Sequence, residues 1–145
     1  MRLPRFGKFL DQLQAAGVET KNARGFWGGV TSEGGIVVTS WTDHHDGNER
    51  FLIHRPETNH GGLKTAWEVG NIHVGVEVRM ILVRQRGDIA KGQHGRTVKD
   101  AALLPGNWRV VEMISDREAR IEESESPSSL NDVSRPQPQS AVGAS

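Results

Sequence analysis

Adjacent histidines are the first side chains in this sequence that could carry chemistry. His44 and His45 lie between two aspartates in the segment 42–51, TDHHDGNERF. Imidazole and carboxylate groups are common zinc ligands, so a metal site is one interpretation. Neighbouring residues of a strand point to opposite faces, however, and the two rings could not easily bind one ion. Further ligands would have to come from His54, His60 or His94.

Asp46 and Gly47 give the same segment a second interpretation. Both central residues of a tight hairpin turn need positive φ, and Asp-Gly is one of the strongest signals for such a turn. A turn at this point places Asp43 opposite Arg50, which is a favourable cross-strand charge pair. We therefore predict a β-hairpin here, with no bound metal and no cofactor.

His60 precedes two glycines, and a His-Gly-Gly segment occurs in the oxyanion loops of some serine hydrolases. Those enzymes also need a serine in a G-x-S-x-G turn, which this sequence lacks, and it contains no cysteine nucleophile. The segment 55–62 is therefore predicted to be a surface loop after a strand that ends at Pro56.

Basic side chains gather after the longest strand-like run, residues 74–86, VGVEVRMILVRQR. Val78, Met80 and Leu82 share one phase of a two-residue alternation, which predicts that they face the core. Arg84 and Arg86 continue that phase, but two unpaired arginines cannot enter an apolar core. The strand must therefore reach the rim of the domain at this point.

The residues that follow extend this basic rim. Lys91 and Arg96 flank Gly92 and Gly95, and exposed glycine N–H groups beside cations can hold a phosphate on many scaffolds. Within residues 50–99 there are nine basic and four acidic side chains. A solvated basic edge that prevents sheet-to-sheet pairing is the alternative interpretation. The predicted anion-binding rim consists of Arg84, Arg86, Lys91, Arg96 and Lys99.

Trp27 is the aromatic residue predicted to bind a ligand. It follows Phe26 in the segment GFWGG, and adjacent aromatics on a strand cannot both face inward. One of the two is therefore expected at the surface, where a nucleic-acid base could stack on it.

The elements that position these residues are a helix and several short strands. Phe6, Phe9, Leu10 and Leu13 have helical spacing, which predicts an amphipathic helix over residues 4–16. Strands are predicted at 26–31, 35–42, 50–55, 65–69, 76–84 and 107–114, and a short helix within 96–106. The predicted fold class is α+β: the N-terminal helix packs on a small antiparallel β-barrel, or a strongly curved sheet, of about five to six strands.

The composition of the 145-residue chain suggests one globular domain, residues 1–114, followed by a tail. Residues 115–145 are rich in serine, proline and glutamate, which predicts disorder. On this basis, removal of residues 118–145 should leave the thermal midpoint within a few degrees.

Charge, cysteine content and hydropathy limit the classes of protein to which this chain can belong. The charges balance, with 18 basic and 18 acidic residues, and no apolar run has the ~18 residues that a membrane helix needs. The absence of cysteine fits a reducing compartment, so we expect a cytoplasmic protein without membrane contact.

The favoured function is a small non-enzymatic nucleic-acid-binding or accessory module that uses the basic rim and Trp27. The alternatives are an interaction or inhibitor protein that acts on a host protein, and an enzyme that uses histidine and carboxylate.

Overall fold

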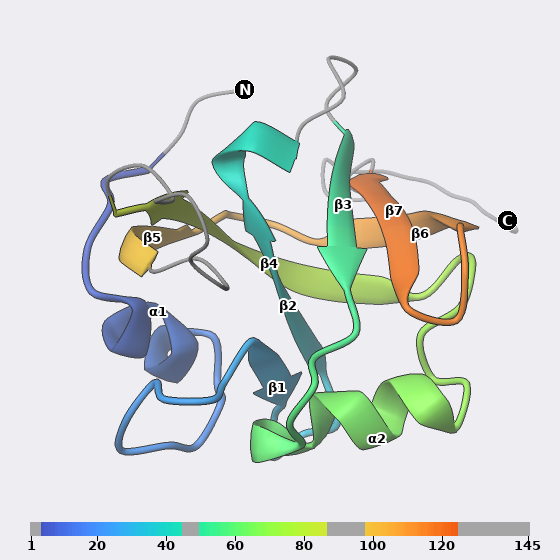
Figure 1. The fold of residues 1–145 in the computed structure, drawn as a ribbon, viewed down its shortest axis with the longest axis horizontal. Helices are drawn as coiled ribbons and strands as arrows, with labels where there is room; N and C mark the ends of the chain where they lie inside the picture. The colour runs from blue at the N-terminus through green and yellow to red at the C-terminus, as the bar shows by residue number, and fades with distance from the viewer. Residues whose placement is uncertain (1–3, 45–49, 87–97, 125–145) are drawn as a thin grey trace, which may run out of the picture.

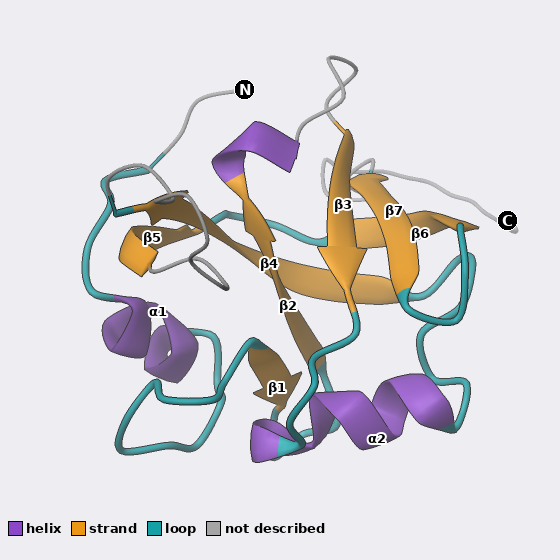
Figure 2. Cartoon of the chain, in the orientation of Figure 1, coloured by secondary structure: helices purple, strands orange, loops and turns teal. Residues whose placement is uncertain are grey.

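The structure is a computed structural model that describes residues 4–44, 50–86 and 98–124 (Figure 1). These residues form two short α-helices, seven strands and two 3-10 turns (Figure 2). In chain order the helices and strands are α1 (Phe9–Ala15), β1 (Gly28–Val30), β2 (Ile36–Trp41), β3 (Arg50–His54), α2 (Leu63–Glu68), β4 (Glu77–Gln85), β5 (Val98–Leu103), β6 (Trp108–Met113) and β7 (Glu118–Glu123). No helix among the described residues is long and apolar enough to cross a membrane.

The strands form one mixed sheet in the order β1-β2-β4-β6-β7-β3, and β5 pairs with β4 beside this path. β2 runs parallel to β4, with Val37 opposite Arg79 and Trp41 opposite Val83, whereas the other strand pairs are antiparallel. The prediction of a purely antiparallel sheet is therefore wrong. A parallel pair needs a long crossover connection, which β3 and α2 provide here.

The sheet curls but does not close into a barrel. β2 and β3 approach each other, and the Ser40 hydroxyl donates a 2.5 Å hydrogen bond to the Leu52 carbonyl, but in the described residues β3 pairs along its length with β7. The α+β class is confirmed, and the barrel is not.

The predicted hairpin between β2 and β3 is also wrong. Both edges of β2 are occupied, by β1 and by β4, so β3 pairs with β7 instead. Residues Thr42–His44 form a 3-10 turn rather than a strand, so the argument that placed His44 and His45 on opposite faces of a strand does not apply. Asp46 and Gly47, where the turn was predicted, lie outside the described residues.

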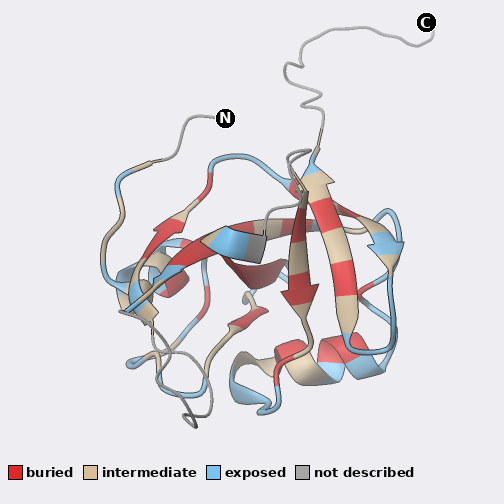
Figure 3. Cartoon of the chain, turned by 45° about the horizontal axis from the view of Figure 1, so that its top comes forward, coloured by how far each residue is buried: buried red, intermediate tan, exposed pale blue. Residues whose placement is uncertain are grey.

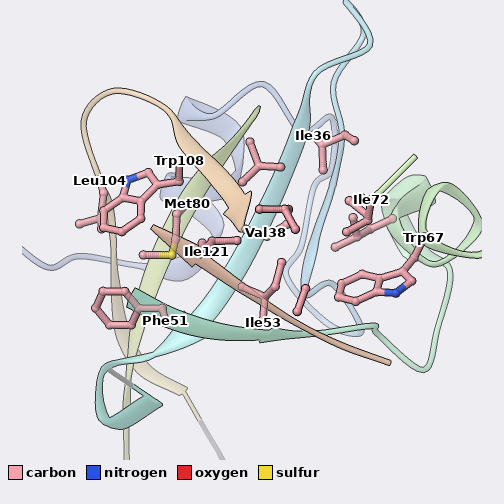
Figure 4. Packing of buried hydrophobic residues seen from close by; sticks show 14 of the residues in the cluster. Ile36, Val38, Phe51, Ile53, Trp67, Ile72, Met80, Leu104, Trp108 and Ile121 are labelled. Carbon is pink, nitrogen blue, oxygen red and sulfur yellow. The ribbon is translucent and has the colours of Figure 1, made fainter. Parts of the chain in front are cut away.

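Two apolar clusters lie on the two faces of the sheet. The inner cluster fills the curl and includes Val38, Met80, Trp108 and Ile121 (Figure 4). The alternation along β3 and β7 is visible as buried positions separated by partly exposed ones (Figure 3). The predicted core phase of β4 is confirmed, because Val78, Met80 and Leu82 are all at most 2% exposed.

The outer cluster lies beneath α1, on the opposite face of β2, β4 and β5. Ile81 and Val83, in the other phase of β4, are also fully buried, because Leu13 and Ala16 pack in the same cluster. β4 is therefore covered on both faces through its centre, as expected for the strand that joins the two halves of the sheet.

The N-terminal helix is shorter than the predicted 4–16. Residues 4–8, here called the N-terminal segment, are extended, and Gly7 exchanges two backbone hydrogen bonds of 2.7 and 2.8 Å with Ala101 of β5. Glycine weakens a helix, and the edge of β5 offers partners for its backbone groups. This contact ties the start of the chain to the sheet.

Two further segments adopt the opposite type of structure from the predicted one. Val98–Leu103 is strand β5, not a helix, because pairing with β4 places Ala101 and Ala102 on opposite buried faces. Conversely, residues 65–69, predicted as a strand, belong mostly to α2, which buries Ala66 and places Trp67 in the inner cluster. Tertiary burial outweighs local propensity in both cases.

The folded region extends past the predicted boundary at residue 114. Glu118–Glu123 forms β7, which lies between β6 and β3 in the sheet. Ala119 and Ile121 are fully buried. The boundary between domain and tail that was predicted after residue 114 is therefore placed too early in the chain. Residues 125–145 lie outside the described residues.

Candidate functional site

A pocket of about 440 Å³ opens between the start of α1, the loop before β1 and the start of β5. Its volume falls in the range of about 300–1,000 Å³ that is usual for ligand sites. Aromatic and aliphatic side chains form most of its wall, and two lysines complete it. The lining residues are Lys8, Phe9, Ala23, Phe26, Trp27, Val98 and Lys99.

Glycines allow the loop before β1 to carry two aromatic residues into this pocket. Gly28 has φ +121°, and a side-chain Cβ there would lie 2.2 Å from the carbonyl oxygen of Val37. Gly25 has φ +77°, and a Cβ there would lie 2.5 Å from the ring of His60. Only glycine fits such conformations and distances without strain. Phe26 and Trp27 are therefore held between two backbone positions that tolerate no side chain.

The His-Gly-Gly segment supports this loop. The His60 ring lies 5.3 Å from the ring of Phe26, and its Nδ1 is 3.0 Å from the Arg24 carbonyl oxygen. The Thr58 hydroxyl donates a 2.5 Å hydrogen bond to the Gly25 carbonyl. Gly61 packs so closely on Gly28 and Gly29 that a Cβ would lie 3.1 Å from their backbone atoms. These contacts give the segment a structural role in holding the wall of the pocket.

Trp27 is half-buried rather than fully exposed. Its ring lies 5.2 Å from Trp41 and 6.1 Å from Phe9. Phe26 is half-buried too. One of the two aromatic residues was predicted to lie at the surface, but neither is fully exposed. The turn made by the glycines allows both to pack against the outer cluster and still line the pocket.

Lys8 and Lys99 supply the positive charge of the pocket. Both are exposed, and in the part of the chain that the structure describes neither forms an ion pair with a carboxylate. The pocket thus combines an apolar aromatic recess with two ammonium groups. This combination suits a flat apolar ring that carries an anionic group.

Arg84 was predicted to bind an anion, and the structure gives it another partner. Its guanidinium donates two hydrogen bonds to the Asp100 carboxylate, at 2.7 and 2.5 Å, and its Cζ lies 4.3 Å from the centre of the Phe6 ring. The hydrogen bonds from Arg84 hold the pKa of Asp100 below its usual value, and those to Asp100 raise the pKa of Arg84. A carboxyl with a lowered pKa stays ionised at neutral pH, and its stabilising contribution is lost only as the pH falls through that lowered value.

The remaining predicted rim residues are placed as follows. Arg86 is exposed just after β4 and does not line the pocket. Lys91 and Arg96 lie outside the described residues. The structure thus brings together Trp27 and Lys99 of the predicted set, and it removes Arg84 as a free cation.

Lys8, Phe9 and Phe26 were not predicted as site residues. Both Lys8 and Phe9 fall within the helix predicted over residues 4–16, and their approach to β5 depends on the long-range contact between Gly7 and Ala101. Phe26 shares the glycine-bounded GFWGG signal with Trp27, and that signal could have predicted both as wall residues.

The described residues contain no group of three or more His, Asp or Glu side chains arranged as metal ligands. The proposal of a metal-free protein stays a prediction, because His45 and His94 lie outside the described residues. Comparison of the chain with protein-family models, with curated proteins and with solved structures finds no match.

Proposed function

We propose that this protein binds single-stranded nucleic acid, with one unstacked base in the pocket and neighbouring phosphates on Lys8 and Lys99. The observation that carries the proposal is the meeting of Trp27 and Lys99, which are far apart in the sequence, in one pocket with Phe9 and Lys8. Stacking on aromatic side chains and backbone contact with cations are the two interactions that single-strand binders combine.

The recess favours a single strand over a duplex. A base must leave the helical stack to enter a pocket walled by Phe9, Phe26 and Trp27, and bases of a single strand are already free to do so. The hypothesis requires no base-specific hydrogen bond, because every base has a flat π-face.

Binding of a single-stranded oligonucleotide should weaken as salt rises, with a slope of ~0.7 per phosphate contact in a plot of log affinity against log salt. We expect Lys8→Gln and Lys99→Gln each to reduce the slope by ~0.7, because each removes one phosphate contact. Trp27→Leu should cost ~1–3 kcal/mol of binding without a change in slope, because stacking releases no counterions. Titration by fluorescence anisotropy at several salt concentrations measures both quantities.

Arg117→Gln is the matched control, since Arg117 is an exposed cation in the turn between β6 and β7, distant from α1 (Figure 1). It should leave affinity and slope unchanged. Absence of binding by the unmodified protein at ~50 mM salt, where the phosphate contribution is strong, would exclude this function.

Protein binding is a second candidate, and one observation favours it. Val69, Val74 and Ile114 are large apolar side chains with exposed fractions of 66%, 58% and 40%. They belong to the loop after α2 and the turn after β6, which lie side by side in Figures 1 and 3. Exposed apolar side chains gathered on one side of a domain are typical of a surface that contacts a partner.

A further inference from the structure

We infer that Arg84 is a positioning residue that holds the N-terminal segment against the sheet and so maintains one wall of the pocket. This inference rests on the proposed function for its effect on binding, but its structural part does not. It assigns to Arg84 a role different from the phosphate contact that the sequence suggested.

The N-terminal segment supplies Lys8, and it leads directly into Phe9; both residues line the pocket. Among the described residues, the backbone of the segment pairs with the sheet at one position. Gly7 pairs with Ala101 through two backbone hydrogen bonds, and one further bond runs from the Leu103 N–H to the side chain of Gln12 in α1. A single bridged residue gives little cooperativity, so side-chain contacts must determine how firmly the segment is held.

Phe6 is the side chain through which Arg84 acts. The ring packs against the inner cluster, whereas Phe9 packs against the outer cluster, so the chain crosses the edge of β5 between two partly buried aromatic side chains. The guanidinium of Arg84 covers the Phe6 ring at 4.3 Å. Asp100, the strand partner of Arg84, binds the guanidinium through both carboxylate oxygens and fixes its plane. A planar guanidinium is suited to bind a carboxylate and an aromatic face at the same time.

Asp100→Asn distinguishes the two possible roles of Arg84, because they predict opposite changes in the affinity for nucleic acid. If Arg84 contacts phosphate, removal of the competing carboxylate frees a cation and nucleic acid binds more tightly. If Arg84 positions the segment, the same substitution loosens Phe6 and weakens binding of a single-stranded oligonucleotide by about threefold to tenfold, the range given by a weak ion pair and one cation–π contact. The slope of log affinity against log salt should stay unchanged in both Asp100→Asn and Arg84→Gln. Tighter binding by Asp100→Asn, or a slope reduced by ~0.7 in Arg84→Gln, would overturn the inference.

A second measurement uses no nucleic acid, so it decides the inference even if the proposed function fails. Trypsin cleaves after Arg5 and Lys8 only when the segment leaves the sheet, and the cleavage rate follows the population of that open state. Arg84→Gln and Asp100→Asn should raise cleavage at these two sites by about threefold to tenfold, whereas cleavage at Arg79 in the centre of β4 should stay at the unmodified rate. Arg86→Gln, which removes an exposed cation two residues away, is the matched control and should change neither rate. Equal cleavage at Arg5 and Lys8 in the Arg84→Gln and unmodified proteins would show that Arg84 does not hold the segment.

Discussion

Deletion of residues 118–145 is expected to abolish cooperative unfolding, in contrast to the small effect that the composition predicted, because it removes β7 from between β6 and β3 in the sheet. β7 pairs on one side with β3 along five residues and on the other side with β6. Without it, β3 has no strand partner among the described residues, and β6 keeps only its short pairing with β4 at Val78 and Trp108. The deletion also removes Ala119 and Ile121, which are fully buried in the inner cluster.

The expected loss of stability follows from the usual free-energy cost of removing buried side chains. Replacement of one buried isoleucine by alanine commonly costs about 2–5 kcal/mol, and a whole domain has about 5–15 kcal/mol of stability. Loss of an entire strand that is paired on both sides therefore exceeds what the fold can tolerate. Thermal unfolding followed by circular dichroism should show no sigmoidal transition.

Deletion of residues 125–145 is the matched control, since it retains every described strand. Its midpoint should stay within a few degrees of the full-length protein. Ile121→Ala should lower the free energy of unfolding by about 2–5 kcal/mol, whereas Glu123→Ala, at an exposed position of the same strand, should change it by less than about 0.5 kcal/mol. A sigmoidal transition near the full-length midpoint after deletion of 118–145 would contradict the position of β7 between β6 and β3.

The contrast between β4 and β7 shows which strands a single sequence reveals. β4 contains an apolar alternation of its own, Val78, Met80 and Leu82, so its core face could be predicted locally. β7, with the sequence EARIEE, has only Ala119 and Ile121 as apolar residues among charged neighbours. It becomes a strand because β3 and β6 are in place on both sides, and that information lies in distant segments of the chain.

The candidate site divides in the same way. Trp27 was predicted because glycines surround it, and Lys99 because it ends a basic run; both signals are local. The role of Arg84 could not be predicted, because its partners Asp100 and Phe6 meet it only after β5 pairs with β4. The sequence thus indicated the kinds of contact that the pocket offers, whereas pairing within the sheet determined which side chains remain available for them.

The effect of Gly28→Ala is expected to be large for a change of one methyl group. Gly28 has φ +121°, and the added Cβ would lie 2.2 Å from the Val37 carbonyl oxygen and 2.9 Å from a methyl group of Leu63. The first neighbour is backbone of a buried strand, so β1 would have to move away from β2. Backbone strain of about 1–3 kcal/mol and a packing cost of about 1–3 kcal/mol together predict a loss of about 2–6 kcal/mol in the free energy of unfolding.

Gly34→Ala isolates the steric part of this loss. Gly34 also has positive φ, at +87°, but a Cβ there meets no atom within 4 Å, so its substitution should cost only the backbone strain, about 1 kcal/mol. Chemical denaturation of the two variants gives the comparison directly. Equal losses in Gly28→Ala and Gly34→Ala would show that β1 and β2 are not in close contact at Val37. A larger loss in Gly28→Ala, with weaker oligonucleotide binding and an unchanged salt slope in the fraction that remains folded, is expected, because Gly28 also fixes the direction in which Trp27 enters the pocket.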